Sequence, residues 1–212
     1  MKIAILTSKN QWFEYYAKIL SKSLDNANIY NDHGDLRGKY DIVFILSYHQ
    51  IVDKGFLSKN KHNIVIHESL LPKGKGWSPL FWQVLDKKKI IPFTMFEASY
   101  GIDDGDIYLV DKLELTGFEL HDELRKKQAE KTIDMCIKFI NNYGKHKILT
   151  RQSGDSTFYK KRDSNDSMLD INKSIKEQFN LLRIVNNKEY PAFFEIDGHK
   201  FLLKIEKFEN LE

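Results

Sequence analysis

Short apolar segments that alternate with amphipathic ones restrict this chain to an α/β fold. Four apolar runs have the length of a buried strand: residues 2–7, 41–46, 63–67 and 90–98. Three stretches with helical patterns lie between them: residues 12–24, 53–59 and 78–86. Strands that alternate with helices build a parallel-rich sheet through right-handed crossovers. We therefore predict a Rossmann-like, doubly wound α/β sheet.

The second half of the chain predicts one more helix and a small appended unit. Thr116 and Glu119 form a T-x-x-E capping box, which predicts the start of a long helix with an apolar stripe. Residues 144–173 are polar and predict a loop-rich excursion. A helix at 174–185 and a hairpin about Asp197-Gly198 should follow. We divide the chain into a main domain, 1–150, and a small C-terminal α+β extension, 151–212.

Charge and cysteine content exclude several classes of protein. Lys and Arg number 33 against 30 Asp and Glu, and the net charge of +3 is too small to indicate a nucleic-acid partner. The single cysteine, Cys136, excludes an intrachain disulfide and a cysteine-based zinc site. No apolar run approaches the roughly 18 to 20 residues of a membrane span, and the apolar start of the chain is short for a signal peptide. We expect a cytoplasmic protein without a membrane partner.

Loops after the strands are where such a sheet binds its ligands. The first, residues 7–12, lacks both G-x-G-x-x-G and a Walker motif, which disfavours NAD and ATP. The second begins at His67 and contains two glycines and two lysines, although a lone histidine at a strand end is more often structural. The third, residues 99–106, holds an acidic cluster without the spacing of a calcium loop, so we expect no metal.

Two motifs together resemble the folate-dependent formyltransferase family. They are NIVIHESLLPKGKG at 63–76 and YGIDDGDIYL at 100–109. The family pattern is Asn-x-His-x-Ser-Leu-Leu-Pro followed by Gly-hydrophobic-Asp-x-Gly-Asp, and His67 and Asp103 stand 36 positions apart, as in the family. The similarity covers residues 2–123 and continues through 151–175, which resembles the segment after the core of methionyl-tRNA and amino-sugar formyltransferases. It implies the formyltransferase fold, with 1–150 as the catalytic domain.

The resemblance also implies the reaction and its residues. The family transfers a formyl group from 10-formyltetrahydrofolate to a primary amine. His67 would be the general acid and base, and Asp103 would orient it and relay a proton. Backbone of two loops would hold the pterin of the donor. The residues that correspond to these loops are His49 to Ile51 and Ala98, Tyr100, Gly101 and Ile102.

One position departs from the family pattern. The family's asparagine, two residues before its histidine, is Val65 here, and valine cannot donate a hydrogen bond to an oxyanion. Loss of such a donor typically costs about 10² to 10³ in rate. Asn63 lies on the same strand face, and our hypothesis is that it partly substitutes as a catalytic residue. The alternative is a folate- or sugar-binding homologue without catalysis.

The acceptor is expected to be a nucleotide-linked amino-deoxy sugar of the kind used for bacterial surface polysaccharides such as lipopolysaccharide. The resemblance assigns substrate binding to Lys75, Gly76, Trp77 and Ser78, with the basic run at 160–162 as a further partner for the diphosphate. A methionyl-tRNA formyltransferase, with its added β-barrel and basic surface, is the lesser alternative. The formyltransferase of purine synthesis has a glycine-rich first loop that this chain lacks, so that function is disfavoured. No sequence signature indicates acetyl-CoA as the acyl donor. The aromatic C-terminal hairpin suggests a homodimer.

Overall fold

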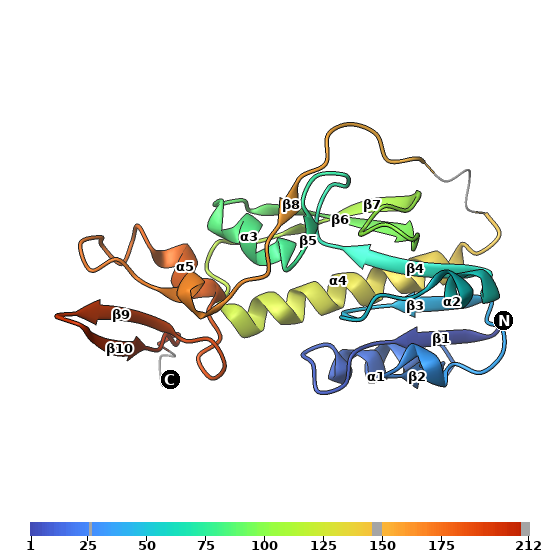
Figure 1. The fold of residues 1–212 in the computed structure, drawn as a ribbon, viewed down its shortest axis with the longest axis horizontal. Coiled ribbons are helices and arrows are strands. Elements are labelled where there is room, and N and C mark those ends of the chain that lie inside the picture. Colours follow the sequence, from blue (N-terminus) through green and yellow to red (C-terminus); the bar gives the residue numbers. More distant parts are fainter. Residues whose placement is uncertain (26, 146–149, 209–212) are drawn as a thin grey trace.

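A six-stranded sheet forms the centre of the protein, seen in a computed structural model that describes residues 1–25, 27–145 and 150–208 (Figure 1). Its strands, in spatial order, are β2 (Asn28–Tyr30), β1 (Ile3–Leu6), β3 (Ile42–Ile45), β4 (His62–His67), β6 (Ile90–Glu97) and β7 (Ile107–Glu114). The first four run parallel, and β6 and β7 are antiparallel to their neighbours. The predicted parallel-rich α/β sheet is confirmed.

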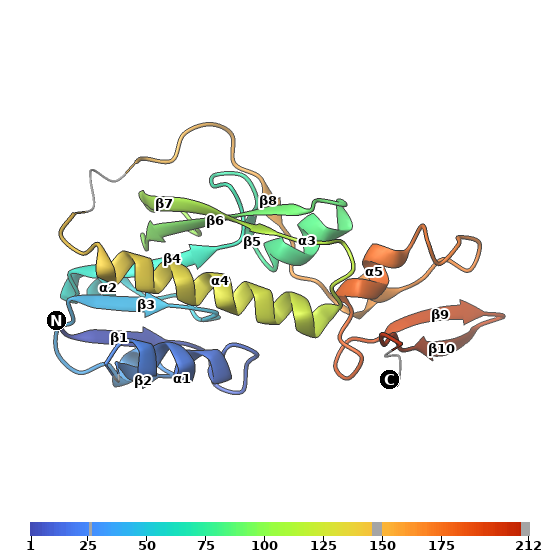
Figure 2. The same cartoon turned by 180° about the vertical axis from the view of Figure 1, so that it is seen from behind.

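Helices cover both faces of this sheet. On one face, Ile5, Phe44 and Ile64 pack against α1 (Glu14–Ser23) and α4 (His121–Asn141). On the other face, Val43 and Ile45 pack against Phe56 of α2 (Lys54–Lys59). Successive strand residues point to opposite faces, so strands covered on both sides are apolar throughout. Figure 2 shows α4 running along the sheet from end to end.

Strand β2 follows β1 in the chain and lies on one side of it, and β3, which follows β2, lies on the other side. The strand order reverses at β1 and β3, and a doubly wound sheet has its ligand crevice at the carboxyl ends of such strands. The loops after the two strands meet there, since the His49 amide donates to the Ser8 hydroxyl at 3.0 Å. The residues after β1, β3 and β4 therefore share one edge of the sheet.

Two boundaries differ from the sequence prediction. The capping box at Thr116 and Glu119 does not open the long helix, because the Glu119 carboxylate accepts the amides of both Thr116 and Gly117 and closes a separate turn. Helix α4 starts at His121, where the Glu123 carboxylate accepts the Leu120 amide. The short edge strand β2 was not predicted, since its half-buried residues carry a weak apolar pattern.

Residues after 150 form short elements beside the main sheet. They are β8 (Phe158–Tyr159), the 3₁₀ turn η2 (Ser164–Ser167), α5 (Phe179–Ile184), β9 (Ala192–Ile196) and β10 (His199–Leu203). The predicted hairpin at Asp197-Gly198 is confirmed, with both turn residues at positive φ. The predicted helix is shorter, because Ser174 and Glu177 bond to each other in a turn that precedes it. Within the described residues, no helix is long and apolar enough to cross a membrane.

A buried ion pair attaches α5 to the turn before α4. Arg183 donates from Nε to the Glu119 carbonyl at 2.9 Å and from Nη2 to the Glu119 carboxylate at 3.1 Å, and both residues are 3% exposed. Burial alone would raise the pKa of Glu119, but the amide donors of Thr116 and Gly117 are among the contacts that lower it to about 2. The carboxylate is therefore charged at neutral pH and needs its partner.

We expect Arg183→Met to lower the free energy of unfolding by about 3 to 5 kcal/mol, because it removes the buried partner of Glu119 and leaves only the partly exposed Lys127, whose Nζ lies 3.6 Å from Glu119 Oε1. Urea denaturation at neutral pH measures this change. Arg37→Met, at an exposed position, is the matched control and should stay within about 0.5 kcal/mol of the parent. A loss below 1 kcal/mol for Arg183→Met would contradict this account.

Candidate active site

His67 ends β4 with its side chain buried beneath the following loop. Its Nε2 atom lies 2.8 Å from the carbonyl oxygen of Gly74. A carbonyl only accepts hydrogen bonds, so Nε2 carries the hydrogen in this arrangement and the ring of a neutral His67 keeps Nδ1 as its acceptor. The imidazole is thus held in one orientation and one tautomer by its own loop.

Asp103 reaches His67 from the loop that follows β6. Its Oδ2 atom lies 3.8 Å from His67 Nε2, a distance that allows an ion pair but exceeds a hydrogen bond. The same oxygen accepts the Gly76 amide at 2.8 Å. The backbone of Asp103 has φ of +47°, a left-handed conformation that is uncommon for residues other than glycine. The structure brings together the two residues that the sequence pairs.

Three side-chain contacts hold the Asp103 loop over β4. Lys75 donates from Nζ to Asp104 Oδ1 at 2.6 Å. The Gln152 amide donates to the carbonyls of Asp103 at 2.9 Å and Gly105 at 2.8 Å. Nothing in the sequence marked Gln152, because a glutamine in a polar loop has no pattern that reveals its target. These contacts fix the carboxylate that faces His67.

Close approach of backbone also shapes this loop at Gly105. A Cβ atom there would lie 1.4 Å from the carbonyl oxygen of Glu97. No side chain fits in that space, so glycine lets the chain after β6 double back tightly. The loop then carries Asp103 along the face of β4 as far as His67.

Residues 150–160, which we call the strap, complete the site from the C-terminal side. Lys75 and Trp77 donate their amides to the carbonyls of Thr157 at 2.9 Å and Tyr159 at 3.1 Å, which pairs β5 (Lys75–Gly76) with β8. The Gly74 amide donates to the Thr157 hydroxyl at 2.8 Å. The strap binds both the His67 loop and the Asp103 loop, so segments on both sides of residue 150, the predicted domain boundary, build the site.

The two loops predicted to hold the pterin lie side by side. Lys54, which begins α2 after the first loop, places Nζ 4.7 Å from the centre of the Tyr100 ring in the second. Large apolar side chains are exposed on both loops: Ile51 is 81%, Tyr100 71% and Ile102 63% exposed. Exposed apolar groups gathered on neighbouring loops indicate a surface that a ligand covers.

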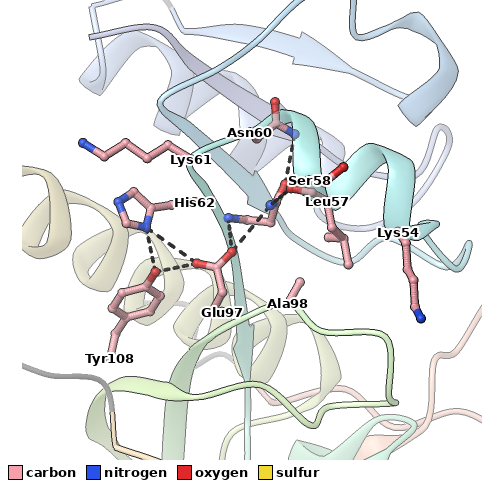
Figure 3. A pocket seen from close by; sticks show the side chains of 10 residues that line it. Lys54, Leu57, Ser58, Asn60, Lys61, His62, Glu97, Ala98 and Tyr108 are labelled. Carbon is pink, nitrogen blue, oxygen red and sulfur yellow. Dashed lines mark hydrogen bonds and ion pairs between the residues drawn. The ribbon is translucent and has the colours of Figure 1, made fainter.

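A cavity of about 580 Å³ opens next to these loops, a volume that suits a small-molecule site (Figure 3). Ala98, Leu57 and Lys54 line one part of it, and a polar cluster of Glu97, His62 and Tyr108 lines another. The Tyr108 hydroxyl donates to the Glu97 carboxylate, and the backbone amide of Asn63 donates to the same carboxylate at 2.6 Å. Burial raises the pKa of Glu97, against the effect of these hydrogen bonds.

Only Ala98 of the predicted pterin residues lines this cavity. The cavity therefore adjoins the predicted folate loops at one residue, while His49, Ile51, Tyr100, Gly101 and Ile102 lie outside its wall. Its polar end, formed by Glu97, His62 and Tyr108, was not indicated by the sequence.

The hypothesis for Asn63 needs correction. Its Nδ2 donates to the Leu57 carbonyl at 2.9 Å and its Oδ1 accepts from Asn60 at 3.0 Å, so both ends of the amide are bonded to α2 and the residue after it. Asn63 and His67 are four strand positions apart, about 13 Å along a strand. The amide of Asn63 therefore stabilises the start of β4 and does not replace the family asparagine at Val65.

The predicted acceptor residues divide into two groups. Lys75 is 4% exposed and bonded to Asp104, so its prediction as a diphosphate ligand is corrected to a role in holding the loop. Gly76 holds Asp103 through its amide, and Ser78 precedes α3 (Pro79–Leu85) with φ of +50°. Trp77 alone is open, at 40% exposure, with the His49 ring 5.6 Å and Lys161 Nζ 5.0 Å from its ring centre.

Comparison with known proteins identifies the family. The family model described as formyl transferase matches residues 21–140, so the chain belongs to the formyl transferase family. Methionyl-tRNA formyltransferase of Clostridium beijerinckii is 34% identical over 154 residues, which are 70% of this chain and 49% of that protein. The chain thus spans about half the length of the curated relatives it matches.

Solved structures of similar fold include a methionyl-tRNA formyltransferase and a 4-N formyltransferase. Methionyl-tRNA formyltransferase from Clostridium thermocellum has a TM-score of 0.81 at 18% identity, over 100% of this chain and 96% of that one. A 4-N formyltransferase from Francisella tularensis has a TM-score of 0.74 at 20% identity, over 98% of each chain. At these identities the similarity establishes the fold.

We expect Gly105→Ala to destabilise the protein by about 1 to 3 kcal/mol, because the new methyl group collides with the Glu97 carbonyl and the backbone must shift. Thermal or urea unfolding measures the loss. Gly144→Ala is the control, since nothing lies within 4 Å of its Cβ and only its positive φ opposes the change. Equal stability of Gly105→Ala and the parent would show that the tight approach is unimportant.

Proposed function

We propose that this protein transfers a formyl group from 10-formyltetrahydrofolate to a primary amine. The observation that carries the proposal is the placement of His67 and Asp103, 36 positions apart in the chain, with Nε2 and Oδ2 3.8 Å apart. Membership of the formyl transferase family supports the same reaction. The exposed apolar residues of the two adjoining loops fit the pterin of the donor.

The reaction needs one group that transfers a proton and a second group that stabilises the first while it holds that proton. Attack of the amine nitrogen on the formyl carbon forms a C–N bond, and the amine must release a proton as it does so. A neutral His67 has Nδ1 left to accept this proton, and the carboxylate of Asp103 favours the resulting imidazolium. When the bond between carbon and the donor nitrogen breaks, His67 returns the proton to that nitrogen.

The proposed acceptor is the amine of a nucleotide-linked amino-deoxy sugar, used in surface polysaccharide synthesis. The open face of Trp77 suits stacking on a ring, and Lys161 beside it suits a phosphate. The buried free thiol of Cys136 fits the reducing cytoplasm where we place the protein. A methionyl-tRNA acceptor is the second candidate, favoured by the names of the relatives; mass spectrometry of products from both acceptors distinguishes the two.

A homodimer also stays a prediction. The hairpin of β9 and β10 exposes Leu202 and Phe201, at 68% and 47%, and such an edge suits pairing with a second copy. The exposed Phe201 and Leu202 also suit contact with a larger acceptor such as methionyl-tRNA. The hairpin therefore does not distinguish between the two candidate acceptors.

We expect His67→Ala and Asp103→Asn each to reduce the rate of formyl transfer by about 10² to 10⁴, since each removes a group that moves or stabilises the proton. Steady-state rates with purified variants measure the effect. His199→Ala and Asp25→Asn are matched controls at exposed positions and should keep the parent rate. Near-normal rates in either active-site variant, with the fold intact, would refute these roles.

Val65→Asn is expected to raise the rate of transfer by at least about tenfold, because it supplies the donor that the family places two residues before its histidine. Val65→Ala is the control, since it makes space without a donor. A rate that stays level or falls in Val65→Asn, at unchanged thermal stability, would show that the oxyanion is stabilised elsewhere. Tight binding of both substrates without product in the parent would favour the non-catalytic alternative.

A further inference from the structure

A cationic cluster that includes two residues of the predicted basic run at 160–162 lies beside Trp77, the exposed residue of the predicted acceptor site. Its members are Arg125 of α4, His49 after β3, and Lys161 and Arg162 after the strap. Burial and the positive charges of Lys161 and Arg125 lower the pKa of His49, as expected if these groups lie near one another. The contacts of the two arginines indicate which kind of ligand the cluster binds. The assignment of that ligand rests on the proposed function.

Arg125 is fixed by two aromatic rings. Its Cζ atom lies 4.4 Å from the ring centre of Trp12 and 4.4 Å from that of Phe81. Stacking of a guanidinium on aromatic faces restricts its rotation and leaves the hydrogen-bonding edge available. Trp12 lies in the segment between β1 and α1, and Phe81 lies in α3, so the guanidinium stands between these two parts of the chain.

The guanidinium of Arg125 has unused hydrogen-bonding capacity. Nη1 donates to Gln128 at 3.0 Å, while Nε is buried with no hydrogen-bond partner in the described part of the chain. The charges of Glu68 and Glu189 reach Arg125, yet no carboxylate pairs with it within 4 Å among the residues that the structure describes. Burial lowers the pKa of Arg125 to about 10, so it stays charged at neutral pH.

Arg162 shows the same deficit. Its Nη2 donates to the Asp166 carbonyl at 3.1 Å, and its Nε is buried without a partner among the described residues. Asp163 and Asp166 are the carboxylates whose charge reaches it. The segment that carries Arg162 is anchored at the crevice, since the Trp82 indole donates to the Lys160 carbonyl at 3.0 Å. A buried donor without a partner costs about 1 to 3 kcal/mol, which a ligand that accepts the bond recovers.

The first loop explains why cations gather here. Residues 7–12 have no glycines, so the loop after β1 offers no nest of backbone amides for an anion. Arginine side chains that approach from α4 and from beyond the strap supply positive charge and paired donors at the same place. Planar, bidentate donors suit phosphate oxygens better than a point charge does.

We propose that Arg125 and Arg162, with Lys161 at the rim, form the subsite that binds the diphosphate of the nucleotide-linked acceptor. The aromatic face of Trp77, next to Lys161, then adjoins this subsite on the side toward the His67 loop. Binding of the diphosphate orients the amino sugar without contact from the groups that move the proton. Loss of the cluster should therefore raise the KM for the acceptor more than it lowers kcat.

The first test measures binding of inorganic pyrophosphate by calorimetry, which needs no turnover. We expect Arg125→Gln and Arg162→Gln to weaken binding by about tenfold or more, and Lys161→Gln by about threefold. Arg37→Gln, at an exposed position between β2 and β3, should bind as the parent does. Since Arg125→Gln loosens the stack between Trp12 and Phe81, circular dichroism checks its fold, and exposed Lys161 supplies an independent variant.

Unchanged pyrophosphate binding in Arg162→Gln and Lys161→Gln, or no binding by the parent, would overturn the proposal. The glutamate of the folate donor is the other source of anionic charge. A loss of affinity in Arg125→Gln for tetrahydrofolate but not for tetrahydropteroate would assign the cluster to the donor and overturn the acceptor subsite. Displacement of pyrophosphate by tRNA but not by nucleotide amino sugars would also overturn it.

Failure of the proposed function gives a different result. If no amine is formylated but pyrophosphate binding depends on Arg125, Arg162 and Lys161 as expected, the result supports the diphosphate subsite and refutes the proposed reaction. If formylation proceeds with an acceptor KM that the three variants leave unchanged, the reaction stands and the subsite does not.

Discussion

The return of the chain after β6 is the constraint on which the site depends. Strand β6 runs antiparallel to β4, so its end lies at the opposite end of β4 from His67. Asp103 approaches His67 only because residues 98–106 double back along the sheet face, tightly enough that Gly105 accepts no side chain. The Gly76 amide and the Lys75 and Gln152 side chains then hold the returned loop in place.

Those restraints come from two parts of the chain that are far apart in the sequence, which makes the site a product of the whole fold. Lys75 belongs to the His67 loop, Gln152 to the strap, and the strap itself pairs with β5. The C-terminal elements are tied in turn to α4 through Arg183 and Glu119. The segments on both sides of residue 150 are therefore coupled, and the crevice that the cationic cluster borders is bounded by both.

Much of the fold was predictable because strands buried on both faces leave continuous apolar runs in the sequence. The hairpin followed equally well from Asp197 and Gly198, since a two-residue turn needs residues that tolerate positive φ. The errors involve the partners of polar side chains. Glu119 caps a turn rather than α4, Lys75 pairs with Asp104 rather than with a ligand, and the side-chain amide of Asn63 binds Leu57 and Asn60. A pattern of residue types does not state which of several polar groups, near or distant in the sequence, a polar side chain will meet.

The sequence by itself determined the class of fold, because hydrophobic periodicity is a local property of the chain. The pairing of His67 with Asp103 was implied by the resemblance of two motifs to the formyltransferase family. Only the tertiary structure decided that Gln152 holds the Asp103 loop, and that Arg125 stacks between Trp12 and Phe81 with an unused donor. These contacts join segments tens of residues apart. They exist because the strand order and the closing strap bring those segments to one edge of the sheet, and neither is encoded in any single stretch of residues.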